Sequence, residues 1–219
     1  LDSDVWFGLP DIINELDNDD EVRCIVIAGK GDGFSAGIDI TMFMSDFQIN
    51  EDMSSTPVDR KKLKNQIQKM QDAFTALSKT SVPVIALAHG HCIGGATALV
   101  SACDIRIATK DAKFSIGETK LGLVADVGIL QRMPKIVSKG DLRELAYTGR
   151  IFDGEYAEKI RFISSTYENF DDLYSAGVKL AEEIASNASN IVQGTKQVLD
   201  KGEDLTTQQA LDFVQLWNT

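Results

Sequence analysis

Residues 89–128, HGHCIGGATALVSACDIRIATKDAKFSIGETKLGLVADVG, are the stretch around which the rest of the chain is organised. The glycine pair Gly94-Gly95 ends an apolar run and precedes small residues typical of a tightly packed helix. Two acids, Glu118 and Asp126, follow among apolar and small residues. Backbone N–H groups at a helix start can stabilise a negative oxygen, and a carboxylate beside them can move a proton. The stretch therefore predicts an enzyme that handles a carbanion next to a carbonyl group.

Upstream of this stretch, the sequence predicts alternating helices and strands. Residues 3–16 and 61–78 carry apolar positions three or four apart, which is the spacing of an amphipathic helix. Residues 22–28 and 84–88 are short apolar runs rich in β-branched residues, typical of strands covered on both faces. This alternation indicates an α/β fold. The polar, irregular residues 44–60 predict a surface loop or lid.

Downstream, the same reading continues into a helical tail. Strands are predicted at 104–109 and 161–166, and helices at 128–137, 139–148, 155–160, 171–186, 188–201 and 205–217. We therefore expect an α/β core over residues 1–170 and a helical C-terminal region over residues 171–219. A helical tail after such a core often packs on a second subunit.

Two backbone amides are candidates for binding an oxygen atom. One is that of Ala36, within the turn Phe34–Gly37, and the other is that of Gly95, at the start of the predicted helix. The glycine-rich residues 29–37 do not fit a dinucleotide fingerprint, because their spacing is G-x-G-x-G and no helix is predicted directly after them. The alternative is that both glycine clusters form tight turns and nothing more.

Glu118 and Asp126 are the candidate acid–base residues. Few cations are adjacent to either of them in the sequence. A carboxylate that is partly removed from water has a raised pKa and is a better base. The alternative is that both are ordinary exposed acids.

Other reactive side chains fit catalysis less well. His89 and His91 stand two residues apart without further ligand spacing, so we expect structural placement and no metal site. Cys92 has no evident base partner, and Ser35 lies in F-S-A-G and not in G-x-S-x-G, so neither is expected to be a nucleophile. The three cysteines are predicted to be buried free thiols, which indicates a reducing compartment.

The composition of the whole chain is that of a globular protein. It has 219 residues, of which 43% are hydrophobic and 25% charged, enough for one domain with or without an appendage. The net charge of −11 argues against a nucleic-acid partner. No apolar run approaches the roughly 20 residues of a membrane span, and no signal peptide opens the chain, so we expect no membrane span.

Four segments together resemble the crotonase (enoyl-CoA hydratase/isomerase) family. They are FSAGIDI (34–40), HGHCIGG (89–95), ACDIR (102–106) and FSIGE (114–118). The resemblance implies a crotonase-like ββα superhelix whose Ala36 and Gly95 amides hold a thioester oxygen. It also implies that Glu118 and Asp126 form the acid–base pair, with an acyl-CoA substrate and no separate cofactor.

Within the family, GLVADVGILQRMPK (122–135) is most similar to the Δ3,5-Δ2,4-dienoyl-CoA isomerases of fatty-acid β-oxidation. Most hydratases have a glycine at the position of Asp126. The resemblance further implies a homotrimer or homohexamer in a mitochondrion or peroxisome. Relatives also begin with two short strands and end with a further helix that this chain lacks, which suggests trimmed ends.

One position departs from the pattern: Ala98 stands where hydratases have a glutamate and dienoyl isomerases an aspartate. The departure argues against a hydratase, because hydration normally uses two carboxylates to activate water. A Δ3-Δ2-enoyl-CoA isomerase, which needs one acid at Glu118, is the nearest alternative. A non-catalytic protein of the same fold that binds acyl-CoA or RNA is the alternative from another class, although the acidic charge counts against RNA.

Overall fold

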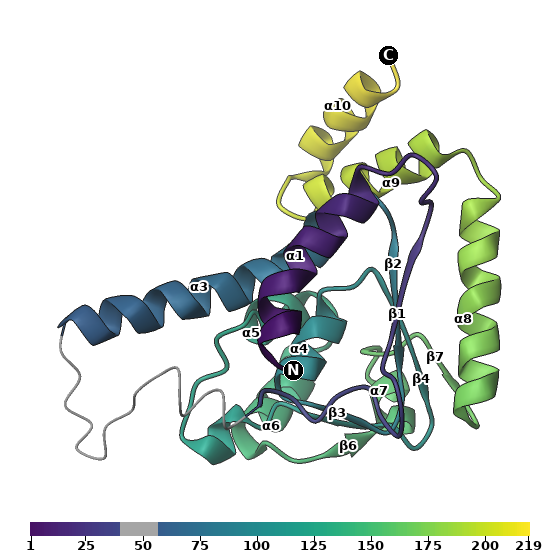
Figure 1. Cartoon of the computed structure of the whole chain (residues 1–219). Coiled ribbons are helices and arrows are strands. Elements are labelled where there is room, and N and C mark those ends of the chain that lie inside the picture. Colours follow the sequence, from purple (N-terminus) through teal and green to yellow (C-terminus); the bar gives the residue numbers. More distant parts are fainter. Residues whose placement is uncertain (40–56) are drawn as a thin grey trace.

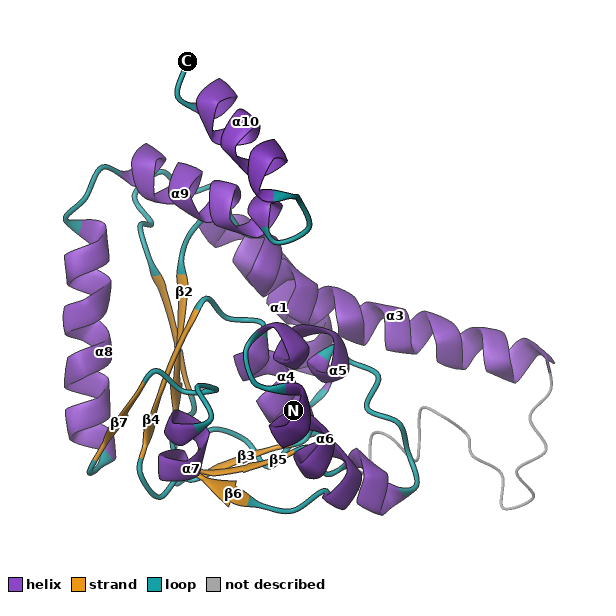
Figure 2. Ribbon diagram, turned by 180° about the vertical axis from the view of Figure 1, so that it is seen from behind, coloured by secondary structure: helices purple, strands orange, loops and turns teal. Residues whose placement is uncertain are grey.

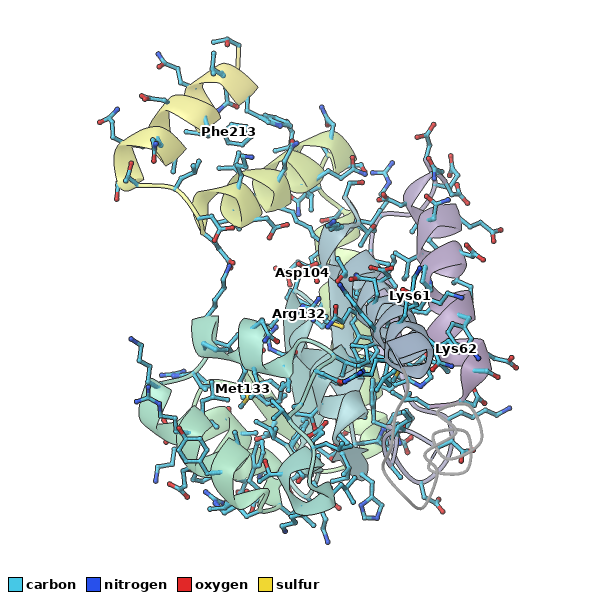
Figure 3. All side chains as sticks on the ribbon, turned by 90° about the vertical axis from the view of Figure 1, so that its left-hand side faces the viewer. Lys61, Lys62, Asp104, Arg132, Met133 and Phe213 are labelled. Carbon is cyan, nitrogen blue, oxygen red and sulfur yellow. The ribbon has the colours of Figure 1, made fainter. Side chains whose placement is uncertain are left out.

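The computed structural model describes residues 1–39 and 57–219. Most of the loop or lid predicted at 44–60 lies outside the described residues. Its last four residues already belong to helix α3 (Pro57–Lys79), so this helix begins earlier than predicted. In Figure 1 the N-terminal half of α3 projects from the body of the molecule. Lys61 and Lys62 are exposed on this half, near the free end of the helix (Figure 3).

A four-stranded parallel sheet forms the centre of the core (Figure 1). Its strands lie in the order β1 (Ile25–Ala28), β2 (Val84–Ala88), β4 (Ile105–Thr109) and β7 (Ser165–Tyr167). Every residue of β2 is buried, as its continuous apolar sequence predicted. The last strand was predicted to start at residue 161, but Arg161 has a φ of +68° and belongs to a turn, so the strand begins four residues later.

A second, three-stranded sheet brings the glycine-rich segments together. It contains β3 (His91–Ile93), β5 (Lys113–Ser115) and β6 (Phe152–Asp153), with β5 parallel to β3 and antiparallel to β6. A parallel bridge joins Ser35 to Cys92 at the edge of this sheet. Strands β3, β5 and β6 were not predicted, because two or three residues are too few to show the alternation of a strand.

Helices cover the two faces of the four-stranded sheet. On one face lie α1 (Ser3–Asp17) and α3, where the rings of Trp6 and Phe74 are 4.8 Å apart. The short helix α4 (Gly95–Ser101) is entirely buried on the same side. On the other face α8 (Phe170–Ala185) runs along the sheet, and its Gly177 packs against Leu87 of β2. Figure 2 shows α8 on one side of the sheet, and α1, α3 and α4 on the opposite side.

A series of short helices begins at Glu118. It consists of the 3₁₀ helix η1 (Glu118–Leu121), α5 (Ile129–Arg132), the 3₁₀ helix η2 (Met133–Lys135), α6 (Lys139–Thr148) and α7 (Gly154–Lys159). The helix predicted over 128–137 is therefore split. Gly128 has a φ of +103° and stays outside the helix, and Pro134 falls where α5 changes into η2.

The predicted helical tail is confirmed as α8, α9 (Ser189–Gly202) and α10 (Thr207–Trp217). Helix α9 is tied to the core because Lys196 Nζ lies 2.7 Å from Asp104 Oδ2 and 3.1 Å from the carbonyl oxygen of Val82. Helix α10 packs on α9 and extends away from the body of the molecule (Figure 1). None of the described helices combines the length and the apolar character that a bilayer crossing requires.

Candidate active site

The turn between β3 and α4 forms the floor of the candidate site. Gly94 has a φ of +55° and leads into Gly95, the first residue of α4. A Cβ at Gly94 would lie 3.3 Å from Oε1 of Glu118. Gly94 therefore keeps a left-handed backbone without strain and leaves room for the Glu118 carboxylate directly over the start of the helix.

The loop that carries Ala36 reaches the same turn. The Ser35 N–H donates to the carbonyl of His91 at 2.7 Å, and the Ile93 N–H donates to the carbonyl of Ser35 at 3.1 Å. A Cβ at Gly37 would lie 2.7 Å from the Ile93 oxygen and 3.9 Å from the Gly95 nitrogen. The backbone on both sides of Ala36 is therefore pressed against the start of α4.

Both candidate amides have a free N–H within the described part of the chain. Neither the Ala36 N–H nor the Gly95 N–H donates a hydrogen bond to any residue that the structure describes. Ala36 is exposed, so a ligand atom can approach it from solvent. Two free N–H groups on adjoining turns, one of them at a helix start, suit the binding of a single oxygen that carries negative charge.

His89 holds the loop that carries Ala36 against the core. The sequence predicted a structural placement for this residue. Its carbonyl accepts the Phe34 N–H at 2.8 Å, and its ring Nε2 lies 3.0 Å from the carbonyl oxygen of Gly31. Its ring also contacts the ring of Phe170, with 4.3 Å between centroids. His89 thus joins the glycine-rich loop to the core. His91, in contrast, is exposed.

Glu118 is the first residue of η1 and is half-buried. Its Oε2 is buried and has no hydrogen-bond partner among the described residues. Burial raises the pKa of Glu118, its own main-chain N–H opposes this rise, and the negative charge of Asp126 adds to it. The carboxylate is therefore a stronger base than an exposed glutamate, as the sequence pattern suggested.

Asp126 lies on residues 122–128, which form neither helix nor strand. Its side chain keeps access to solvent, yet neighbouring atoms partly displace water from it. This desolvation raises the pKa of Asp126, and its own main-chain N–H opposes the rise. Its negative charge adds to the rise in the pKa of Glu118, so the two acids lie close enough to interact.

Other chemistry fits the site poorly. Burial raises the pKa of the Cys92 thiol far above its ordinary value, so this residue stays a thiol. The Ser35 hydroxyl accepts the Gly37 N–H at 3.2 Å and helps to shape the turn. Ala98 is fully buried within α4 and supplies no acid. No group of three or more metal-ligating side chains occurs among the described residues.

A large cavity lies next to Gly128, two residues beyond Asp126. It has a volume of about 1500 Å³, and residues from α3, α4, α5 and α9 line it. Neither the two amides nor the two acids border it. Since Glu118 and the two free N–H groups gather at the start of α4, we place the chemistry there and not in the cavity.

The sequence is similar to that of known acyl-CoA enzymes. A family model described as enoyl-CoA hydratase/isomerase matches residues 1–216. A mitochondrial Δ3,5-Δ2,4-dienoyl-CoA isomerase of Dictyostelium discoideum is 38% identical over the whole chain, which covers 74% of that protein. A peroxisomal Δ3,5-Δ2,4-dienoyl-CoA isomerase of Arabidopsis thaliana is 36% identical over the whole chain, which covers 79% of that protein.

Solved structures show the same architecture. An enoyl-CoA hydratase from Bacillus anthracis superposes with a TM-score of 0.88 at 25% identity, over 99% of this chain and 79% of that one. A putative enoyl-CoA hydratase from Thermobifida fusca in complex with CoA superposes with a TM-score of 0.84 at 27% identity, over 96% of this chain and 79% of that one.

The extent of these matches shows that the chain belongs to the enoyl-CoA hydratase/isomerase family, also called the crotonase family. It is an acyl-CoA enzyme of that family with the crotonase fold. The family resemblance and the fold class predicted from the sequence are both confirmed.

Proposed function

We propose that this enzyme converts 3,5-dienoyl-CoA to 2,4-dienoyl-CoA. One observation supports the proposal most: Glu118, beside the start of α4, and Asp126, on a separate segment, both have raised pKa values, and the charge of Asp126 acts on Glu118. An isomerase that moves conjugated double bonds along a chain must exchange protons at two separate carbon atoms. Two acids on different segments can serve two such positions.

The reaction then proceeds as a proton transfer through an enolate. The thioester oxygen accepts hydrogen bonds from the N–H groups of Ala36 and Gly95, and Glu118 removes a proton from C2. The negative charge spreads along the conjugated chain, and a protonated Asp126 donates a proton to C6. Each amide donor of this kind typically lowers the barrier by ~3 kcal/mol, because its hydrogen bond strengthens as the oxygen gains charge.

The relatives support this substrate. Those from Dictyostelium and Arabidopsis are both named dienoyl-CoA isomerases, and each aligns over the whole chain. The Thermobifida structure was solved with CoA bound, which supports an acyl-CoA ligand for this fold. The raised pKa of Asp126 also fits its role, because an acid that donates a proton must be partly protonated when the reaction starts.

The proposal is tested by assaying the protein on 3,5-dienoyl-CoA and on 3-enoyl-CoA. The conjugated 2,4-dienoyl product is followed by its ultraviolet absorbance, and the 2-enoyl product by a coupled hydratase assay. We expect kcat/KM to be higher for the dienoyl substrate. A clear preference for 3-enoyl-CoA would contradict the proposal. Binding of both thioesters without turnover would indicate a non-catalytic member of the family.

The second candidate is a Δ3-Δ2-enoyl-CoA isomerase. The buried Ala98 favours it, because α4 supplies no acid near Glu118 and a single acid can move a proton from C2 to C4. The same residue argues against a hydratase, which needs a second carboxylate to activate water. The presence of Asp126 favours the dienoyl reaction over both.

We also propose a homotrimer or homohexamer assembled in part through the helical region at 171–219. Four large apolar side chains on α9 and α10 are more than half exposed and remain available for a partner: Ile191, Leu199, Leu211 and Leu216. The cavity between α9 and the core offers space for a neighbouring subunit. The compartment is proposed to be a mitochondrion or a peroxisome, as in the relatives.

A further inference from the structure

We propose that Gln71 and Arg132 hold Asp126 in place and thereby set the preference of the enzyme for dienoyl over enoyl substrates. The inference rests on the proposed function and deepens it. Both would be positioning residues, since they act on the backbone around Asp126 and not on the substrate.

The backbone around Asp126 depends on side chains for its hydrogen bonds. Nε2 of Gln71 donates to the carbonyl oxygen of Asp126 at 2.6 Å. Nη1 of Arg132 donates to the next carbonyl oxygen, that of Val127, at 3.3 Å. Among the described residues, no backbone N–H donates to either carbonyl. Two consecutive peptide groups are thus held by side chains from two different helices.

Gly128 allows Arg132 to reach this position. A Cβ at Gly128 would lie 1.9 Å from Nη1 of Arg132, so the guanidinium group lies directly across the glycine backbone. The φ of Gly128 is +103°, which a larger residue would adopt only with strain. Figure 3 shows Arg132 set back beside α3. Its Nη2 donates to Oγ1 of Thr75 on that helix at 3.1 Å.

The two positioning residues share one support. The Thr75 hydroxyl, which accepts from Arg132, donates in turn to the backbone carbonyl of Gln71 at 2.7 Å. Gln71 and Thr75 are four residues apart, so they lie on the same face of α3. The neighbouring Phe74 and Leu77 are fully buried and fix this part of α3 in the core. The position of Asp126 is therefore tied to the core through α3.

Glu118 is held independently of this network. The hydroxyl of the adjacent Thr119 donates to the carbonyl of Ala146 on α6 at 2.7 Å, and neither Gln71 nor Arg132 takes part in this bond. Loosening the segment around Asp126 should therefore impair proton transfer at C6 and leave transfer by Glu118 intact. A misplacement of a catalytic group by about 1 Å can cost a factor of about 10² in rate.

Gln71→Met tests the inference, because methionine has a similar length and no N–H donor. We expect kcat on 3,5-dienoyl-CoA to fall by roughly tenfold, with little change in KM, and kcat on 3-enoyl-CoA to stay within about twofold of wild type. The matched control is Gln68→Met, one turn earlier on α3. Gln68 is exposed and bonds only to Asp72 on its own helix among the described residues, so both activities should persist.

A second measurement separates positioning from a general loss of structure. In an Asp126→Asn background, Gln71→Met should cause no further loss, because the residue acts through the carboxylate that is already absent. Equal losses on both substrates, no loss on the dienoyl substrate, or additive losses in the double variant would overturn the inference. A wild-type enzyme that is inactive on dienoyl-CoA would overturn the proposed function and this inference together. A wild type that is active, with an unaffected Gln71→Met variant, would overturn the inference alone.

Discussion

Glu118 and Asp126, the two acids proposed to act on one substrate, are supported in different ways. Glu118 opens a 3₁₀ helix bonded to α6, and its carboxylate lies over the buried start of α4. Asp126 lies on an irregular segment whose carbonyls bond to side chains of α3 and α5. The difference teaches that the acid proposed for the enolate step is placed by a 3₁₀ helix of its own segment, whereas the acid proposed to distinguish the substrates depends on side chains of two other helices.

Replacing Glu118 should have the largest effect. Glu118→Gln removes the base proposed to take the C2 proton and keeps the shape of the side chain. Because both isomerisations begin at C2, we expect kcat on dienoyl and enoyl substrates to fall by a factor of about 10²–10⁴. Steady-state assays of both substrates check this result. Full activity on either one would remove Glu118 from the mechanism.

Replacing Asp126 should lower activity on the dienoyl substrate far more than activity on the enoyl substrate. Asp126→Asn removes the proposed proton donor at C6, so kcat on 3,5-dienoyl-CoA should fall by about 10²-fold. Isomerisation of 3-enoyl-CoA requires no chemistry at C6 and should change by only a few-fold. The ratio of the two kcat values is the measurement. An unchanged ratio would show that Asp126 does not select the substrate.

Gly37→Ala should impair both reactions to a smaller and equal extent. The new Cβ would collide with the Ile93 carbonyl at 2.7 Å and displace the Ala36 N–H. Weakening one oxyanion donor should lower kcat by about tenfold or more on either substrate. Gly31→Ala is the matched control: Gly31 also has a positive φ of +96°, but no atom lies within 4 Å of its Cβ position. Equal loss in both variants would assign the effect to backbone strain.

The smallest effect concerns stability and pH. Burial raises the pKa of Glu118 above its ordinary value of 4.5. The folded state therefore favours the protonated form of Glu118. The stabilisation of the folded state that results is complete below pH 4.5 and is lost as pH rises through the raised pKa. Above that pH, Glu118→Gln should raise the melting temperature slightly relative to wild type. Thermal unfolding between pH 4 and 8 checks the sign, with the exposed Glu15→Gln as the control.

Much of the fold could be predicted from the sequence, because its long elements have clear patterns. The apolar spacing at 3–16 and in the tail predicted helices, and the β-branched runs predicted the strands of the parallel sheet. The sequence pattern did not predict elements that form only by pairing with segments far away in the chain. Strand β3 forms because Cys92 pairs with residues on two other segments, which local sequence does not reveal. Leu63 is one of the apolar positions in the helix predicted over 61–78, but it is 39% exposed, since that end of the helix projects from the body.

The candidate site also contains residues that the sequence predicted and residues that only the structure shows. Glu118, Asp126, Ala36 and Gly95 were predicted from motif and chemistry, and the structure brings the two glycine segments and Glu118 together. Gln71 and Arg132 were not predicted as functional residues. Gln71 lies 55 positions from Asp126 and looks like any polar residue on a helix. Only the folded chain shows that its amide reaches the backbone of the second acid.

The most direct test of the account follows hydrogen exchange at each end of the substrate. Asp126→Asn is incubated with 3,5-dienoyl-CoA in D₂O, and deuterium at C2 and C6 is measured by NMR. If Glu118 acts at C2 and Asp126 at C6, the variant should still exchange the C2 hydrogen while product labelled at C6 nearly disappears. Loss of both C2 exchange and product formation in the variant would contradict the division of roles between the two acids.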